Sequence, residues 1–428
     1  MTQQADPIEQ QNWQRRFFTI WTGQAFSILG SQLVQFALVW YLTRETGSAV
    51  VLTTATLVAL LPSIFLGPLA GSFVDRGNRR RIMMIADTSI ALLTLTLAIL
   101  FALDLVQIWH IYVLMFLRSL GGSFHGPAMA ASTSLMVPKR HLARIQGVNQ
   151  MLGGGLNIIA APLGALLLEL LPMQGVLAVD VVTAMLAVVP LFFFQVPQPP
   201  KPAAGAEPTS FWQDFRAGFR YVFQWRGLLI ILLMATAINF MLTPAGALTP
   251  LLITQYFEGG VKDLALFDAV FSVGVIVGGL MLGAWGGFKR QVATVLVGII
   301  GIGLFSFIVG VVPPSAFLLA VASMFGVGIA VPVTNGSLGA IFQTAVDPNM
   351  QGRVFTLIGS VATAASPISL VLSGPLSDQF GVQSWYMAGG LVCMLIGVLG
   401  FFLPAVMSVE KGHPSQQSPA AEPAATAG

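Results

Sequence analysis

Gly71-Ser-Phe-Val-Asp75-Arg76-Gly-Asn-Arg79-Arg80-Arg81 is a charged segment that separates two long apolar runs, at 49–73 and 82–103. Each run has roughly the 20 residues that an α-helix needs to cross about 30 Å of hydrocarbon. Only 9% of the 428 residues are charged, so one acid and four arginines in so short a segment stand out. We therefore expect a fold built from membrane-spanning helices joined by short charged turns.

Apolar runs of this length recur from Phe17 to Val406. A signal peptide would give one short run before a polar domain, and barrel strands would give short alternating segments, so neither fits. The hydrophobic content of 55% and the mean hydropathy of +0.82 also exceed those of a soluble domain. We predict an all-α integral membrane protein with twelve transmembrane helices, centred on 17–41, 49–73, 82–103, 109–136, 147–171, 175–196, 227–252, 265–287, 291–312, 316–344, 354–377 and 383–406.

The positions of the cations predict the orientation. Seventeen of the twenty Lys and Arg lie in the tails or in loops that alternate to one side, whereas only Arg44 and Lys262 lie in loops on the other. By the positive-inside rule both termini are cytoplasmic, in a multi-pass cell-membrane protein, most simply of a bacterial inner membrane. The formal charge of +3 then reflects topology, and we expect no nucleic-acid partner. Cys393 is the only cysteine, which excludes a disulfide framework or a thiolate metal site within one chain.

The runs fall into two groups of six. After a cytoplasmic tail at 1–16, the first half covers 17–197 and the second covers 227–407, with a linker at 198–226. Aromatic residues at 211, 215, 219 and 223 repeat every four residues in the linker, which predicts an amphipathic helix at the membrane surface. Residues 408–428 are rich in Pro, Ala, Ser and Gln, and we expect a disordered cytoplasmic tail.

The two halves also resemble each other. An offset of 212 residues lays Gly71 on Gly283, and the arginine segment on Gly283-Ala-Trp-Gly-Gly-Phe-Lys289-Arg290-Gln. The same offset lays a polar stripe of the first run on a polar stripe of the seventh, each on one helix face. A duplicated bundle with matched stripes is typical of a solute pathway between two halves. The candidate cavity residues are Gln24, Ser27, Ser31 and Gln35 in the first half, and Thr236, Asn239 and Thr243 in the second.

These features carry a family resemblance over nearly the whole chain. The chain resembles the major facilitator superfamily, and within it the drug:proton antiporters of the macrolide-efflux and enterobactin-exporter type. The superfamily's loop pattern has Gly two residues after the Arg, where this chain has Asn78 preceded by Gly77. The matching segments are Thr46-Gly-Ser, Leu61-Pro-Ser, Gly67-Pro-Leu-Ala-Gly-Ser-Phe-Val-Asp-Arg-Gly-Asn-Arg-Arg-Arg-Ile, Val137-Pro-Lys-Arg-His-Leu-Ala-Arg, Trp285-Gly-Gly-Phe-Lys-Arg and Gly352-Arg-Val-Phe.

The resemblance implies a gate at the charged segment. In the family the loop acid pairs with loop cations and with the start of the eleventh helix, which holds the cytoplasmic side shut. Carried over, Asp75 is the latch acid, with Gly71, Arg76, Arg79 and Arg80 as the rest of the gating motif. The alternative is that the arginines serve only as an orientation signal. The second copy has Gly287 where the first has Asp75, so the acid is present in one half only.

Arg118 is the charge placed deepest in the membrane. It lies about ten residues into its run, roughly 15 Å deep. A charge there costs at least ~2.5 kcal/mol unless it is paired or hydrated, so it should face the interior. It matches the family's fourth-helix arginine, a position associated with proton coupling, although a structural ion pair is the alternative. By depth, its expected partner is Asp87.

Asp87, Asp180 and Asp268 are the candidate proton-carrying acids, because burial favours the protonated form of a carboxyl group. Asp180 and Asp268 lie within a turn or two of the outer face. For each of them, a role at the helix end or facing water fits the sequence as well as a role as a proton site. His125 precedes Gly126-Pro127 and can titrate near neutral pH, but a packed histidine beside a helix kink is the simpler interpretation.

The leading functional prediction is a secondary active exporter of hydrophobic or amphipathic small molecules, driven by a proton gradient and alternating access. Export of one metabolite such as a siderophore, proton-coupled import, and a non-transporting receptor remain alternatives. Nothing supports an enzyme: the four histidines are scattered and no Gly-x-x-x-x-Gly-Lys phosphate loop is present. We expect no cofactor and no metal, and a protein that works as a monomer in the lipid bilayer.

Overall fold

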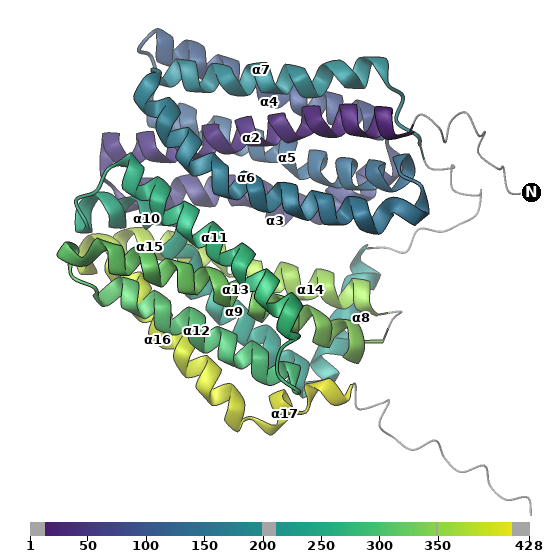
Figure 1. The fold of residues 1–428 in the computed structure, drawn as a ribbon, viewed down its shortest axis with the longest axis vertical. Coiled ribbons are helices and arrows are strands. Elements are labelled where there is room, and N and C mark those ends of the chain that lie inside the picture. The colour runs from purple at the N-terminus through teal and green to yellow at the C-terminus, as the bar shows by residue number, and fades with distance from the viewer. Residues whose placement is uncertain (1–12, 199–210, 348–349, 413–428) are drawn as a thin grey trace, which may run out of the picture. The chain divides into compact units, whose positions relative to one another are not determined.

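The computed structural model describes residues 13–198, 211–347 and 350–412, which are mostly helical and form no β-strand (Figure 1). The all-α fold expected from the sequence is confirmed, and each of the twelve apolar runs is helical. The main helices are α2 Trp13–Thr46, α3 Ala49–Arg76, α4 Arg79–Ala102, α5 Ile108–Met136, α6 Leu142–Leu170, α7 Met173–Phe193, α8 Phe211–Gln224, α9 Arg226–Ala247, α11 Val261–Trp285, α12 Gln291–Val311, α13 Phe317–Ala345, α14 Gln351–Ala364, α15 Ser366–Phe380 and α16 Gln383–Phe402.

Eleven helical stretches of the described residues are long and apolar enough to cross a membrane. α5 is not among the eleven, although it has 29 residues and packs against α3 and α4. Its sequence includes Arg118, His125 and several Ser and Gly, which lower its hydropathy. The least apolar of the twelve long runs is therefore the one that contains both Arg118 and His125.

The chain divides into two compact units. Unit 1 comprises residues up to 204 together with 247–269 and 370–382, and unit 2 comprises 205–246, 270–369 and 383 onward. Unit 1 therefore contains α2 to α7, and also short α10 (Thr249–Leu251), the beginning of α11 and the end of α15. This grouping crosses the boundaries at 197 and 227 that the two apolar groups define in the sequence.

Close packing of α2 on α7 sets the frame of unit 1. Gly23 lies so near α7 that a Cβ atom would stand 2.3 Å from the Leu186 carbonyl oxygen. Two turns later, a Cβ on Gly30 would meet the Thr183 hydroxyl at 2.2 Å. Both positions therefore require glycine, and the absence of a side chain lets the two helix backbones approach each other.

The charged segment between α3 and α4 is more helical than the sequence indicates. We expected a loop bearing Asp75 and the arginines, but α3 extends to Arg76 and α4 begins at Arg79. Only Gly77 and Asn78 join them. The Asn78 side chain accepts the N–H of Arg81 at 3.1 Å, which caps α4 and explains its early start.

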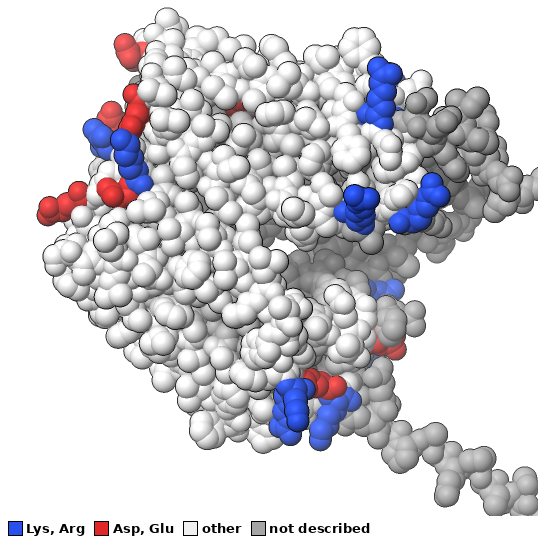
Figure 2. Space-filling view, in the orientation of Figure 1, with Lys and Arg blue, Asp and Glu red and all other residues white. Residues whose placement is uncertain are grey.

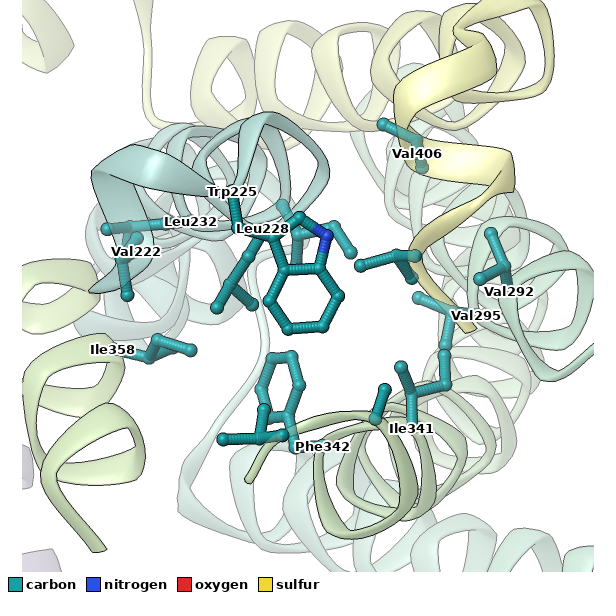
Figure 3. Close-up of a cluster of buried hydrophobic side chains, with 14 of the residues drawn as sticks. Val222, Trp225, Leu228, Leu232, Val292, Val295, Ile341, Phe342, Ile358 and Val406 are labelled. Carbon is teal, nitrogen blue, oxygen red and sulfur yellow. The ribbon is translucent and has the colours of Figure 1, made fainter. Parts of the chain in front are cut away.

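In unit 2, α12 packs along both α13 and α16. Beside them, apolar side chains from α8, α9, α12, α13 and α14 converge in one cluster (Figure 3). Trp225 lies in this cluster near Phe342, with Val222, Leu228 and Ile341 around them. α8, the amphipathic helix expected in the linker, contributes Val222 to the cluster and is anchored on α14.

Two details differ from the boundaries read in the sequence. The eleventh run is interrupted at Ala365, because Pro367 has no N–H to donate to the carbonyl of Thr363, four residues earlier. The ordered chain also continues past 407. Val409 is fully buried, and the Glu410 carboxylate accepts the N–H of Val292 at 2.5 Å at the beginning of α12. Residues 413–428 lie outside the described part.

Within each unit, nearly all charged side chains visible in Figure 2 gather at the ends of the helices. The visible surface between those ends is almost entirely uncharged. This distribution is what a hydrocarbon layer around the middle of each unit requires.

Candidate functional site

Three helices of unit 1 present polar side chains seven residues apart: Gln24 and Ser31 on α2, Asp87 and Thr94 on α4, and Arg118 and His125 on α5. Seven residues are nearly two helical turns, about 10 Å, and return to the same face. The six side chains form two layers. The arginine layer contains Ser31, Thr94 and Arg118, joined by Asp180 of α7, and the histidine layer contains Gln24, Asp87 and His125.

Asp180 is the centre of the arginine layer. Arg118 Nη1 lies 2.6 Å from Asp180 Oδ2, and the Thr94 hydroxyl donates to the same oxygen at 2.9 Å. Ser31 donates to the other oxygen, Oδ1, at 3.1 Å. The Asp180 side chain is fully buried and that of Arg118 is 11% exposed. Gly30 makes room here, because a Cβ would stand 3.0 Å from Asp180 Oδ1.

The histidine layer closes a ring of three side chains. His125 Nε2 lies 3.2 Å from Asp87 Oδ1 and 2.8 Å from Gln24 Oε1. The Gln24 amide nitrogen donates to Asp87 Oδ2 at 2.8 Å. The Asp87 side chain is 4% exposed and that of His125 is 13% exposed. Both carboxylates of the site therefore have their oxygens paired, as burial in a membrane protein demands.

Two cavities of unit 1 adjoin these layers. One, of about 360 Å³, is lined by residues of both layers, including Arg118, Asp87 and Ser31, and by Gln35. The other, of about 470 Å³, is lined by Gln24, Trp21, Asn149 and a mainly apolar remainder. His125, Ile28 and Gln32 line both. The smaller cavity is lined mostly by polar residues and the larger one mostly by apolar residues, and both volumes are typical of small-molecule sites.

Two arginines of the charged segment bind helix ends. Arg79 is buried, and its guanidinium donates to the Ala131 carbonyl at 2.7 Å near the end of α5. Arg80 donates to the carbonyls of Leu191 and Phe192, the latter at 2.8 Å, in the last turn of α7. Cations stabilise the exposed carbonyls and the negative end of a helix, so both arginines hold the helix ends of unit 1 together.

Comparison with known proteins identifies the family. The family model described as Major Facilitator Superfamily matches residues 20–370. The chain belongs to this superfamily.

Proteins whose names specify efflux are similar to this chain over most of its length. Macrolide efflux protein A of Streptococcus pyogenes is 34% identical over 388 residues, which are 91% of this chain and 96% of that protein. Macrolide efflux protein A of Enterococcus faecalis is 32% identical over 324 residues, or 76% of this chain and 100% of that protein. Multidrug efflux pump Tap of Mycolicibacterium fortuitum is 25% identical over 397 residues, covering 89% and 94%.

Solved structures confirm the superfamily fold. A POT family transporter in complex with a thioalcohol-conjugated peptide has a TM-score of 0.73 at 11% identity, over 92% of this chain and 97% of that one. A bacterial homologue of the human lysosomal transporter Spinster, inward-facing and unoccupied, has a TM-score of 0.69 at 13% identity, over 97% and 100%.

Part of the superfamily's gating motif lies outside the described side chains. Gly71, Asp75 and Arg76 are in α3, but the surroundings of Gly71 and the side chains of Asp75 and Arg76 are not described. In the second copy, Gly287 has φ of +84°, in a turn that begins after α11 ends. An acidic side chain would be strained in that backbone, so the two copies of the motif have different turns as well as different residues.

The remaining candidates are placed as follows. Thr236 and Asn239 donate to carbonyls of their own helix, α9, and Thr243 contacts the Ser366 hydroxyl at 3.2 Å. Asn239 also lines a cavity of about 260 Å³ in unit 2 that is otherwise largely apolar. Ser27 is buried at the wall of the smaller cavity of unit 1. Asp268 is half-buried in α11, and no described side chain hydrogen-bonds to it.

The expected pairing of Arg118 with Asp87 is wrong, because Arg118 pairs with Asp180 and Asp87 pairs with His125. α4 and α5 run antiparallel, so Arg118 is level with Thr94 and His125 is level with Asp87. His125, taken as a packed residue, is thus part of the site. The seven-residue spacing shared by three runs is the signal in the sequence that could have revealed both layers.

Proposed function

We propose that this chain exports hydrophobic or amphipathic small molecules, macrolides among them, in exchange for protons. The observation that carries the proposal is the pair of cavities in unit 1, whose shared wall contains a buried charged network. A cavity with apolar walls can bind an amphipathic molecule, and an ionisable network beside it can bind and release protons.

The relatives support the substrate class. Two proteins whose names specify macrolide efflux are 34% and 32% identical to this chain, and a third is a multidrug efflux pump. Export by alternating access between two six-helix halves is the mechanism we infer for the chain. Asp75 is the proposed acid of the gate, and the protein is proposed to act as a monomer without a cofactor, with both termini cytoplasmic.

Reconstitution tests the proposal. Purified protein in proteoliposomes with an acidic interior should accumulate a macrolide, because protons leaving the vesicle drive the drug inward. A proton ionophore should abolish the accumulation, and protein-free liposomes provide the control. Accumulation that persists after the gradient is collapsed would exclude proton exchange. Accumulation only with an alkaline interior would indicate import by symport, and binding without any flux would favour a receptor.

A further inference from the structure

The two layers differ in their capacity to take up a proton. Asp180 accepts three hydrogen bonds, one of them from the guanidinium of Arg118, and is fully buried. A proton on Asp180 would leave the Arg118 charge without its counter-ion in a membrane-embedded site, which is costly. The arginine layer is therefore a fixed structural pair whose net charge is zero.

His125 is in a different position. Its Nε2 atom faces Asp87 Oδ1 and Gln24 Oε1, and both of these atoms are acceptors. Nε2 must therefore carry hydrogen, which leaves a lone pair on Nδ1 of the neutral ring. No polar atom of the described residues hydrogen-bonds to Nδ1, and the ring lines both cavities of unit 1.

We propose that His125 Nδ1 accepts the proton that is exchanged for substrate, while Asp87 stays ionised and positions the ring. The inference rests on the proposed proton-coupled export. Water in the cavity delivers the proton, a new Nδ1–H bond forms, and the ring becomes imidazolium. The reverse transfer to water on the other side of the membrane restores the neutral ring. The Nε2 hydrogen bonds are kept in both states, so the layer need not rearrange.

Protonation of Asp87 itself is disfavoured by the same geometry. Its two oxygens accept from His125 and from the Gln24 amide, and a proton on either would need an acceptor. Besides the Nδ1 lone pair of His125, the other acceptor of the layer is Gln24 Oε1, which already faces His125 Nε2. The carboxylate also stabilises the imidazolium by direct charge attraction.

Few charged side chains surround His125. Arg118 lies two turns away on the same helix and is neutralised by Asp180 of α7, and Asp87 is the acid of α4. α2 presents Gln24, and residues 49–74 of α3 include no titratable side chain. The cavity wall thus has a net charge of −1 when His125 is neutral and zero when it is protonated. Protons and cationic amphipathic molecules should therefore compete for this site.

Nuclear magnetic resonance of protein labelled with ¹⁵N-histidine tests the proton site without any transport. The resonances missing from His125→Gln identify the ring, with His110→Gln as a control on the same helix. We expect the Nε2–H tautomer in the neutral ring and a second proton at Nδ1 on acidification. An Nδ1–H tautomer, or a ring that stays neutral throughout, would overturn the assignment.

Flux measurements test the coupling role. Glutamine can keep the Nε2–H donor but cannot be protonated, so His125→Gln should lose gradient-driven accumulation. His110→Gln, on the same helix and outside both cavities, should keep it. The wild type should release protons when a permanently cationic dye or a macrolide binds, and His125→Gln should not. Coupling that survives in His125→Gln and is lost in Asp268→Asn would reject the inference but leave proton-coupled export intact. Wild-type flux independent of pH, with the histidine titrating as expected, would reject the proposed function instead.

Discussion

The carboxylate of Asp180 is fully buried and accepts from three side chains, so it should be needed for folding more than for proton transfer. Asp180→Asn leaves the Arg118 charge unpaired, which typically costs about 3–5 kcal/mol. We expect a clear fall in the thermal unfolding temperature of the purified protein. Asp104→Asn is the control, because Asp104 is exposed and Asn tolerates its positive φ of 55°.

Replacing both partners should be milder than replacing one. Arg118→Met with Asp180→Leu removes the charge together with its counter-ion, so no buried charge is left over. A double variant less stable than Asp180→Asn alone would contradict the view that the arginine layer is a structural pair.

The sequence identified most residues of the site but not which side chains pair with each other. Arg118, Asp87, Asp180, Gln24 and Ser31 were recognisable because polar residues in apolar runs are expensive. The depth of a residue along its own helix does not specify which residue of a neighbouring helix lies at the same level. For that reason the depth estimate paired Arg118 with Asp87 incorrectly. The partner depends on how α4, α5 and α7 are aligned, which no single run reveals.

Between elements, Arg80 and Arg81 distinguish two roles of the arginines that follow Gly77 and Asn78. One role is to set the orientation in the membrane by charge, and the other is to cap a neighbouring helix. Arg80 donates to two carbonyls at the end of α7, whereas the side chain of Arg81 is exposed and makes no hydrogen bond or ion pair with the described residues. Each substitution to Gln removes one positive charge from the same turn. Arg80→Gln should lower thermal stability by about 1–3 kcal/mol, and Arg81→Gln should not.

Equal losses in the two variants would mean that the arginines act through charge alone. The measurement is the thermal unfolding of both proteins in the same detergent, together with their abundance in membranes. Because the two variants share the same charge, a difference between them reports the capping of α7.

The approach of α2 to α7 is a second test between elements. A Cβ at Gly23 meets the backbone oxygen of Leu186, so Gly23→Ala must force the helices apart. Gly147→Ala is the matched control, because nothing lies within 4 Å of a Cβ there. We expect lower thermal stability for Gly23→Ala only, since alanine otherwise favours helix by about 1 kcal/mol. Equal stability of the two variants would contradict the observed packing.

The existence of the helices followed from hydropathy, but their ends did not. α3 and α4 extend into the charged segment because Asn78 caps α4, and the eleventh run is broken at Ala365 ahead of Pro367. Such boundaries depend on one or two residues, whereas hydropathy is averaged over about 20. The repeat in the sequence likewise does not reveal that 247–269 and 370–382 belong to unit 1.

For the molecule as a whole, one proton bound at His125 determines how much charge each cycle moves. Exchange of one proton for a neutral molecule moves one net charge, and exchange for a monovalent cation moves none. A membrane potential of about 100 mV is worth about 2.3 kcal/mol per charge, or roughly 50-fold in accumulation at equilibrium. At a fixed pH gradient, accumulation of a neutral substrate should therefore change with the potential, and that of a permanently cationic substrate should not. Potassium and valinomycin set the potential in proteoliposomes, and a potential-dependent cation would mean that more than one proton is exchanged.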